Sequence, residues 1–490
     1  MNRKISILVL SLTFLFGIIL SNLEQTIQTF AYIETLFSWI FNSEFLYYFI
    51  ISIIFYDYFK SIIKLLILRL STKNSTNNIK YNQNSLSNKQ KFSILIPAYH
   101  ADRIKETIQS VIDSSYKNKE IIVIVNGNDK TTLEKAAYLE KKYPELVKVL
   151  FLEKKGKALA LNHGLKWAKG DFVITLDADA KIINKKSIDN ILKRFESDKQ
   201  VIAMSADIQI SPGDNCTKNI WTKFQALEYL INMHVGKRFQ TIFNTMLIIP
   251  GGFGVFKREY LKDKTPFNEQ SLTEDFVISL DIHAYGKKVV FEPNAIARFD
   301  CPDNFTKLKA QRTRWSCGQI NTLKSFKHFF FLPGYNRLLK LAILDMWTFD
   351  VFFNAIWITT FLVVLPSILI FSGLDLITEQ IEIENNPLHV IPKILEKPGM
   401  VFGEIKTALL PMVLIGFYFI IESISVLSAI RISNRKECYN LLWYLPLFVF
   451  IYRPILRLLI IRGHIKGIRG KTISWNGKEE TIPFQVAPKL

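Results

Sequence analysis

Long apolar runs lie towards the two ends of the chain, on either side of a mixed central region. Ile5 to Leu20 is uncharged, and a second run, Phe45 to Tyr56, continues amphipathically to Leu70. Three later runs, Val351 to Phe371, Ala408 to Ile430 and Leu441 to Ile461, are each long enough, at roughly 20 residues, to cross a bilayer as a helix. This pattern predicts a soluble domain held between membrane segments.

The first and last apolar runs each allow two interpretations. The first is short and follows Arg3 and Lys4, as a secretory signal peptide would, but no small-x-small cleavage pattern follows Leu20, which favours a retained anchor. In the last run, Pro446 and Pro454 indicate a broken or partly re-entrant element, because proline interrupts a helix. The sequence therefore leaves the number of crossings open by one, and with it the side of the C-terminal tail.

In the central region the pattern changes to short apolar runs of strand length, which alternate with amphipathic stretches of helical period. Strands are predicted over Phe92 to Ile96, Glu120 to Val125, Val147 to Leu152 and Phe172 to Leu176, and helices over Ile104 to Ile112, Thr132 to Lys142 and Lys157 to Ala168. This alternation predicts a parallel-rich sheet wound with helices. In such sheets ligands bind beyond the carboxyl ends of the strands.

Charge distribution orients the predicted domains. The 490 residues carry a formal net charge of +19, yet the basic residues gather beside apolar runs, for example at Arg431, Arg435 and Lys436, whereas the segment after Phe371 is acidic. By the positive-inside rule the central domain is cytoplasmic and the acidic loop lies outside. A basic face of this kind suits anionic headgroups and phosphate substrates, so nucleic acid is not expected as a partner.

The predicted organisation follows from these patterns. It comprises an N-terminal membrane region with two apolar segments (1–70), a linker rich in Asn, Ser, Thr and Lys (71–90), a cytoplasmic domain (91–318), interfacial amphipathic helices (319–345), a C-terminal membrane region with about three spanning segments (346–461) and a basic tail (462–490).

Two carboxylates follow the strand that ends at Leu176. Asp177 and Asp179, spaced i and i+2, can reach one divalent cation such as Mg²⁺ or Mn²⁺, which takes oxygen ligands and is commonly shared with substrate phosphates. The alternative is a solvated turn. Lys157 follows Gly156 at a predicted helix start, where a cation and free backbone amides can face phosphate; the alternative is a solvated lysine.

Two further positions carry candidate chemistry. Glu274 and Asp275 precede an apolar helix pattern, where they suit acid–base chemistry, although Thr273 could simply cap the helix with two favourable acids in its first turn. Trp315 follows the amphipathic stretch Phe305 to Ala310, and its flat ring can pack on the C–H face of a pyranose. The alternative for Trp315 is an interfacial anchor.

Taken in order, the motifs resemble those of the processive family 2 glycosyltransferases, the membrane synthases of cellulose, chitin, hyaluronan and poly-N-acetylglucosamine. The motifs are Ile96-Pro97-Ala98-Tyr99, Lys155-Gly156-Lys157-Ala158, Asp177-Ala178-Asp179, Gly251-Gly252-Phe253-Gly254, Thr273-Glu274-Asp275 and Gln311-Arg312-Thr313-Arg314-Trp315. The segment Gln225 to Tyr229 also resembles the family's acceptor entrance, with an ordinary amphipathic helix as its alternative. The resemblance implies an α/β GT-A-like nucleotide-sugar transferase domain embedded between transmembrane α-helices, in a multi-pass protein of the cell membrane.

The resemblance also implies roles for residues of this chain. Asp275 would be the general base, and Asp179 with Asp177 would hold Mg²⁺ or Mn²⁺. The donor would be bound by Pro97, Tyr99, Asn126, Asp129, Lys157, Asp177, Gln311 and Arg314, and the acceptor by Trp315, Glu274 and Gly252. Two departures concern the donor: Asn126-Gly127-Asn128-Asp129 replaces the usual nucleoside motif, which leaves uridine less secure, and His100-Ala101-Asp102 replaces Asn-Glu, which shifts the acidic contact to Asp102 or removes it.

The function that the resemblance implies is inverting, processive elongation and translocation of a β-linked polysaccharide. Gly318 favours UDP-N-acetylglucosamine as donor, with UDP-glucose or GDP-mannose next. The expected partners are the nucleotide sugar, the growing polysaccharide, membrane lipids and, as an option, an accessory membrane subunit. Two alternatives remain: transfer of one sugar to a polyprenyl phosphate carrier, and a silent scaffold or sugar-sensing subunit. The Gln311 to Trp315 motif opposes the first and the intact carboxylates oppose the second.

Overall fold

The computed structural model describes residues 44–75, 90–210, 219–261, 265–326, 335–354, 358, 398–473 and 479–481. The chain divides into two compact units. One comprises Met1–Lys60 and Thr359–Ala408, and its described parts are the first portions of helices α3 (Glu44–Ser75) and α16 (Pro398–Ser433). The other comprises Ser61–Ile358 and Leu409–Leu490 and contains the sheet and every residue discussed below.

An eight-stranded mixed sheet forms the centre of this second unit. Its strands are β1 (Phe92–Ala98), β2 (Lys119–Asn126), β3 (Val147–Leu152), β4 (Phe172–Leu176), β5 (Lys181–Ile182), β6 (Val201–Ile210), β7 (Phe253–Lys257) and β8 (Lys288–Phe299), in the spatial order β3-β2-β1-β4-β7-β6-β8-β5. Strands β1 to β4 pair in parallel, as the sequence predicts. Strand β7 runs antiparallel to β4 and β6, so the second half of the sheet departs from the parallel arrangement.

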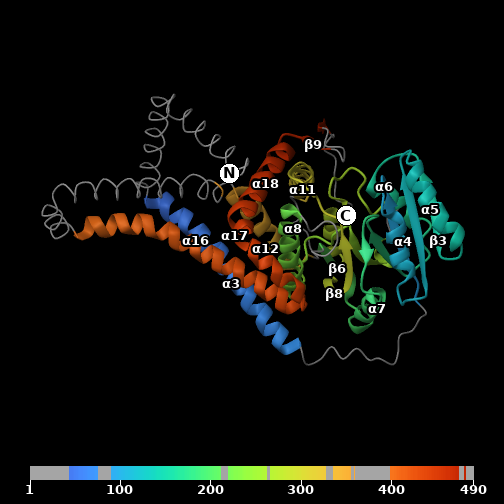
Figure 1. The fold of residues 1–490 in the computed structure, drawn as a ribbon, viewed down its shortest axis with the longest axis horizontal. Coiled ribbons are helices and arrows are strands. Elements are labelled where there is room, and N and C mark those ends of the chain that lie inside the picture. The colour runs from blue at the N-terminus through green and yellow to red at the C-terminus, as the bar shows by residue number, and fades with distance from the viewer. Residues whose placement is uncertain are drawn as a thin grey trace, which may run out of the picture. The chain divides into compact units, whose positions relative to one another are not determined.

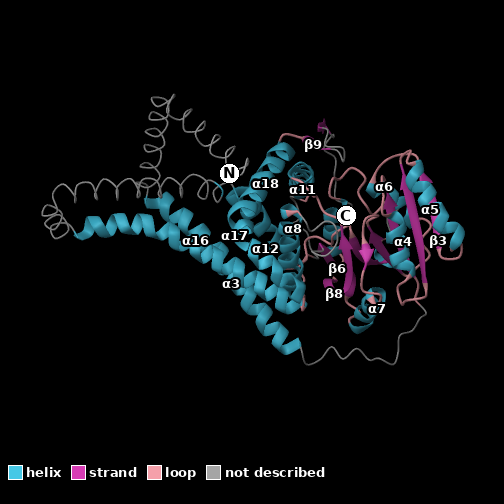
Figure 2. Cartoon of the chain, in the orientation of Figure 1, coloured by secondary structure: helices cyan, strands magenta, loops and turns pink. Residues whose placement is uncertain are grey.

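Helices cover both faces of the sheet, which gives three layers (Figures 1 and 2). Alternation along β1 sends Phe92, Ile94 and Ile96 to one face and Leu95 to the other. The first face packs on α4 (Ile104–Ile112), α5 (Lys130–Lys142) and α7 (Ser187–Ser197). The second packs on α6 (Lys157–Leu165) and α10 (Glu274–His283). Buried on both faces, the central strands read as nearly continuous apolar runs.

Further helices bring the C-terminal part of the chain against this domain. They are α8 (Ile220–Ile231), the π-helix η2 (Asn232–Lys237), α9 (Arg238–Phe243), α11 (Phe305–Ser325), α12 (Arg337–Asp345) and the π-helix η5 (Met346–Phe353). Helix α11 is much longer than the predicted stretch Phe305 to Ala310, and it packs along α18 (Arg453–Ile468), as Figure 1 shows. A short hairpin of β9 (Lys471–Ile473) and β10 (Glu479–Thr481) follows α18.

Among the residues that the structure describes, two helical segments are long and apolar enough to cross a membrane, Gly416–Ser433 and Lys436–Ile468. The predicted run Ile5 to Leu20 and most of Val351 to Phe371 lie outside the described residues. Between Lys436 and Ile468 the backbone changes helix type rather than breaking. The successive segments are a 3-10 helix η7 (Lys436–Tyr444), α17 (Leu445–Leu447), a π-helix η8 (Phe448–Tyr452) and α18. Pro446 and Pro454 are the second residues of α17 and α18, next to the points where the helix type changes, and such an irregularity within a continuous helix accommodates a residue that has no N–H.

Candidate active site

The candidate residues gather where β1, β2 and β4 end, at one edge of the sheet. Because the three strands are parallel, Tyr99 after β1, Asn126 at the end of β2 and Asp177 after β4 lie at the same edge. Antiparallel β7 starts there, so Gly252 lies beside Asp177 and its carbonyl accepts the Asp177 N–H at 3.0 Å. A Cβ on Gly252 would lie 2.6 Å from the Phe299 ring, which explains the need for glycine.

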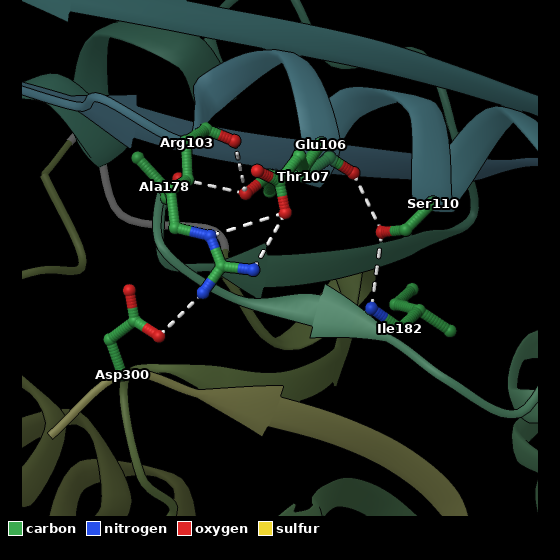
Figure 3. Close-up of polar contacts among 7 residues, drawn as sticks. All are labelled: Arg103, Glu106, Thr107, Ser110, Ala178, Ile182 and Asp300. Carbon is green, nitrogen blue, oxygen red and sulfur yellow. Dashed lines mark hydrogen bonds and ion pairs between the residues drawn. The ribbon is translucent and has the colours of Figure 1, made fainter. Parts of the chain in front are cut away.

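Helix α4 holds the turn that carries the two aspartates (Figure 3). Thr107 Oγ1 donates to the carbonyl of Ala178 at 2.7 Å, and Ser110 Oγ accepts the N–H of Ile182 at 3.1 Å. Hydrogen bonds on both sides of the turn fix its backbone. The positions of Asp177 and Asp179 are thereby set by the scaffold rather than by a free loop.

An arginine that the sequence analysis did not single out stands beside this turn. Arg103 Nη1 donates to Asp300 Oδ1 at 2.6 Å and Nη2 to Glu106 Oε2 at 2.6 Å (Figure 3). Asp300 follows β8 and lies 197 positions from Arg103, so no local pattern could pair them. Asp102 is the residue that the sequence analysis offered for the family's acidic contact. Its side chain is 97% exposed, and one of its oxygens lies 3.4 Å from Lys135 Nζ on α5. Of these two acids, Asp300 is the one whose charge acts on Asp179 in the turn.

The aspartate pair has the chemistry that a hard divalent cation requires. The Asp179 side chain is partly exposed to solvent. The protein around it nevertheless displaces water from the carboxylate, and this desolvation together with the negative charge of Asp177 raises the pKa of Asp179 to about 7. A cation would relieve this excess of negative charge. Among the described residues no group of three or more His, Cys, Asp and Glu could hold a metal ion. The pair therefore fits a shared site, in which substrate phosphates and water complete the coordination.

Lys157 links this pair to the Thr-Glu-Asp motif. Its Nζ lies 2.6 Å from Asp177 Oδ1 and 3.5 Å from Glu274 Oε1. Helix α6 begins at Lys157, after Gly156 at φ 151°, a conformation that favours glycine. Burial alone would lower the pKa of Lys157, but the attraction of Asp177 and Glu274 outweighs it and raises the pKa. Lys157 is therefore a fixed cation and not a solvated lysine.

Asp275 and Glu274 occupy the first turn of α10 in different environments. Asp275 is half-buried, and its Oδ2 accepts the N–H of Gly251 at 3.1 Å. Glu274 is buried, which raises its pKa. Thr273 makes no side-chain cap for the helix; its Oγ1 instead lies 3.2 Å from Thr322 Oγ1 on α11. The capping explanation for this motif thus fails at its first residue.

Helix α11 carries Gln311, Arg314 and Trp315, and it brings Arg314 near the carboxylates of Glu274, Asp275 and Asp177. Arg314 Nη1 lies 3.5 Å from the carbonyl of Leu272, and burial lowers the pKa of Arg314 against the attraction of Glu274 and Asp275. Trp315 is half-buried. Gln311 Oε1 is buried, and it has no hydrogen-bond partner in the described part of the chain. A buried acceptor of this kind is suited to a donor group on a ligand.

The other residues that were predicted to bind the nucleotide-sugar donor make hydrogen bonds between the loops around the site. Asn126 Nδ2 donates to the carbonyl of Ala98 at 3.1 Å, and its Oδ1 accepts the N–H of Gly156 at 3.2 Å. Asp129 caps α5 and accepts the N–H of His100 at 2.6 Å. Their polar atoms thus join neighbouring loops. Two more predicted residues lie on β1 or directly after it: Pro97 is buried within the strand, and Tyr99 has Lys155 Nζ 4.5 Å from its ring centroid.

Comparisons with known proteins agree with this arrangement. Residues 93–264 match the family described as Glycosyl transferase family 2. Over 227 residues, 46% of this chain, it is 31% identical to poly-beta-1,6-N-acetyl-D-glucosamine synthase of Staphylococcus aureus (strain MSSA476) and 30% identical to that of Staphylococcus epidermidis. The matched region spans about half the length of these relatives (54%).

The fold has a solved counterpart as well. A mannosyltransferase from Pyrobaculum calidifontis, solved with GDP-Man and Mn²⁺, aligns with a TM-score of 0.51 at 14% sequence identity. The alignment covers 88% of this chain and 99% of that one. At this identity the likeness concerns the fold alone.

Proposed function

We propose that residues 93–264, which match Glycosyl transferase family 2, form a domain of that family, and that the protein is a membrane-bound, inverting, processive transferase that elongates a β-linked polysaccharide. We propose UDP-N-acetylglucosamine as donor, because the relatives at 31% identity are named for a polymer of that sugar. UDP-glucose and GDP-mannose come next, the latter because GDP-Man was bound to the solved protein of similar fold.

The observation that carries this proposal is the convergence of three separate segments on Lys157. Its ammonium lies between Asp177, at the end of β4, and Glu274, at the start of α10. Gly251, from the loop before β7, completes the contact, since a Cβ there would lie 3.1 Å from Lys157 Nζ and 3.3 Å from Asp275 Cβ. Such an array of buried charges has little structural value by itself, because desolvation offsets most of the attraction.

The donor half of the reaction follows from these charges. Asp177 and Asp179 would hold Mg²⁺ or Mn²⁺, which supplies charge neutralisation for the leaving diphosphate. Lys157 and Arg314 add fixed positive charge beside the carboxylates of α10. In this proposal the two cations stabilise the negative charge that the diphosphate gathers as the C1–O bond breaks. Both side chains are held in place before the donor arrives, so little reorganisation is needed.

Transfer requires a base for the acceptor hydroxyl, and we assign this role to Asp275. Its carboxylate takes the proton as the acceptor oxygen attacks C1 of the donor sugar from the face opposite the diphosphate. A bond from that oxygen to C1 forms, the C1–O bond to phosphate breaks, and the nucleoside diphosphate leaves with the electron pair. The single displacement inverts C1. The Gly251 N–H holds the Asp275 carboxylate for this step at 3.1 Å.

The proposed binding and translocation of the polysaccharide acceptor depend on Trp315 and the apolar helices. An indole ring can stack on the terminal sugar of the growing chain. A transferase that also moved its product across the membrane would need several spanning helices beside that platform, and two segments of sufficient length and apolarity lie in the described residues. A lipid-carrier enzyme would need them only as anchors.

The test uses purified protein in sealed vesicles with radiolabelled UDP-N-acetylglucosamine, UDP-glucose or GDP-mannose supplied outside. We expect long chains from one donor, deposited in the lumen and resistant to an external glycosidase. Single sugars on an extractable lipid would replace the synthase proposal by the lipid-carrier alternative. Polymer fully open to digestion would remove translocation alone. No turnover of any nucleotide sugar would overturn the enzymatic proposal.

A further inference from the structure

Behind Trp315 three polar side chains from distant segments meet in a buried group. Glu228 Oε2 on α8 accepts hydrogen bonds from Arg312 Nη2 at 2.8 Å and from Tyr452 Oη at 2.6 Å. Arg312 is on α11 and Tyr452 ends the π-helix η8. The side chains of Arg312 and Glu228 are 7% and 18% exposed, and Tyr452 is fully buried.

This group touches the proposed sugar platform directly. The Arg312 guanidinium carbon lies 4.4 Å from the centroid of the Trp315 ring, one helical turn further along α11. A planar guanidinium over an aromatic face favours one orientation of the ring. Because Glu228 binds Arg312 by a charge-assisted hydrogen bond, it fixes the guanidinium and, through it, the plane of the indole.

The opposite charges of Arg312 and Glu228 stabilise the group. Burial alone would lower the pKa of Arg312, but the charge of Glu228 outweighs it and raises the pKa. Aromatic rings seal the group from water on the Tyr452 side, with the Phe224 and Phe448 centroids 5.0 and 5.5 Å from that of Tyr452. In such surroundings the loss of one partner leaves a charge or a polar atom without its bond, so the group behaves as a unit.

The same helix that carries Tyr452 into the group is packed closely on α11. A Cβ on Gly463 would lie 2.5 Å from Ser316 Cβ, and one on Gly467 would lie 3.1 Å from the carbonyl of Cys317. Two glycines four residues apart allow backbones to approach in this way. Lys324, near the end of α11, also donates to the carbonyl of Gly467 at 3.2 Å. Helices α18 and α11 are therefore closely packed along their length.

We propose that Glu228, Arg312 and Tyr452 form a positioning triad that holds the Trp315 ring in its sugar-binding orientation and ties this platform to the C-terminal apolar helix. The inference rests on the proposed function for the acceptor role of Trp315. Its consequence is a division of labour: the triad sets acceptor affinity and product length, while donor binding depends on Lys157, Asp177 and Arg314.

The decisive variant is Tyr452→Phe, which removes one hydroxyl and keeps the ring that packs with Phe224. Vesicle-reconstituted protein is assayed with radiolabelled UDP-N-acetylglucosamine and a short β-linked N-acetylglucosamine oligosaccharide. We expect the acceptor KM to rise about tenfold, as for the loss of a hydrogen bond to a buried charge, with shorter products and a donor KM within about twofold of the unmodified value. Glu228→Gln should behave in the same way.

The control is Glu422→Gln. Glu422 accepts a hydrogen bond from Arg453 at 3.0 Å, so this variant also weakens a polar pair, at the residue directly after Tyr452, and leaves the three side chains of the triad unaltered. Its acceptor KM and product length should equal those of the unmodified protein. Thermal melting of all variants in detergent separates loss of fold from loss of position.

A double-mutant cycle distinguishes positioning from general packing. In the Trp315→Ala background, Tyr452→Phe should add nothing to the acceptor KM, because the triad acts through the indole. Additive effects, or an unchanged acceptor KM in both Tyr452→Phe and Glu228→Gln, would overturn the triad while leaving the proposed function standing. Absence of transfer by the unmodified protein with every nucleotide sugar would instead overturn the proposed function and the triad with it.

Discussion

Lys157 Nζ lies 2.6 Å from Asp177 Oδ1, which joins the first residue of α6 to the first residue after β4. The pair connects two motifs that are 20 positions apart in the sequence and lie at the same edge of the sheet. Glu274, at 3.5 Å, extends the connection to the helix of the proposed base. One lysine thus couples the geometry of the donor half of the site to that of the transfer half.

Replacement of Lys157 by methionine tests this coupling. The buried Glu274 would lose its cation, so the free energy of unfolding should fall on the order of 3 kcal/mol, and the affinity for nucleotide sugar about tenfold or more. Denaturation in detergent and donor titration measure the two effects. Lys154→Met is the control, because Lys154 is exposed on the preceding loop. Equal behaviour of the two variants would show that Lys157 is only a surface charge.

Asp179→Asn tests the metal site. Because Asp179 is partly exposed, we expect the protein to remain folded, while transfer that depends on Mg²⁺ or Mn²⁺ falls on the order of 10² or more. Asp102→Asn should retain near-normal activity, because that carboxylate is 97% exposed and faces α5. Full activity of the unmodified protein in excess chelator would contradict the assignment.

Asp275→Asn separates binding from chemistry. The amide oxygen can still accept the Gly251 N–H, but it cannot take the acceptor proton. We expect a donor affinity within a few-fold of the unmodified value and a rate that is lower on the order of 10² or more. Rapid polymerisation by this variant would move the base elsewhere, and Glu274 would be examined next.

Local pattern was sufficient for the parallel half of the sheet and for the motif residues at its edge. The runs of β1 to β4 alternate with amphipathic helices along the chain, and this alternation predicts parallel strands even for β1 and β4, which pair across about 80 positions. The antiparallel β7 could not be predicted in this way, because the alternation that indicates parallel pairing was identified only as far as β4, and the apolar pattern of a strand does not give its direction. Short elements such as β5 carry too few residues for a period to appear.

The same reasoning explains which site residues were missed. The aspartates after β4 and the glycines before β7 belong to motifs that occur in a recognisable order along the sequence. The Arg103–Asp300 pair has no such signal, because it depends on where β8 ends in space. Glu228 and Arg312 lie in segments that the resemblance singled out, but their contacts with each other and with Tyr452 form only where three segments of the chain meet. Asn126 and Asp129 also hydrogen-bond neighbouring loops, a structural role that their sequence position did not indicate.

His283 makes the stability of the domain depend on pH. It is buried in α10, where its Nε2 donates to the carbonyl of Met246 at 2.8 Å, and burial lowers its pKa from 6.5 to about 4. Between these values the unfolded chain binds a proton that the folded protein does not, so the free energy of unfolding falls as the pH drops through this window. The full loss is about 3 kcal/mol.

Thermal melting of the unmodified protein and of His283→Gln across pH 7 to pH 4 measures this contribution. Glutamine can still donate to Met246 but does not titrate, so its melting temperature should fall less steeply with decreasing pH. Parallel curves for the two proteins would mean that other groups govern the acid limit.

Gly318 sets the distance between the helix of the proposed platform and the Thr-Glu-Asp motif. A Cβ at this position would lie 2.5 Å from Thr273 Cγ2 and 2.7 Å from its Oγ1, so Gly318→Ala must push α11 away from the start of α10. Overpacking of this kind typically costs about 1–3 kcal/mol. It also shifts Arg314 and Trp315 relative to Asp275, and a displacement of about 1 Å at reacting groups can lower the rate on the order of 10².

The matched control is Gly416→Ala in α16, where a Cβ would meet no atom within 4 Å. That variant should melt within a few degrees of the unmodified protein or slightly above it, because alanine is favoured over glycine in a helix by about 1 kcal/mol. Activity assays with saturating donor and melting in detergent compare the two. If Gly318→Ala kept both its stability and its rate, the contact with Thr273 would be compliant, and the spacing of α10 and α11 would not limit catalysis. If instead Gly318→Ala lost more activity than its lower stability accounts for, the spacing of α10 and α11 would be part of the active-site geometry.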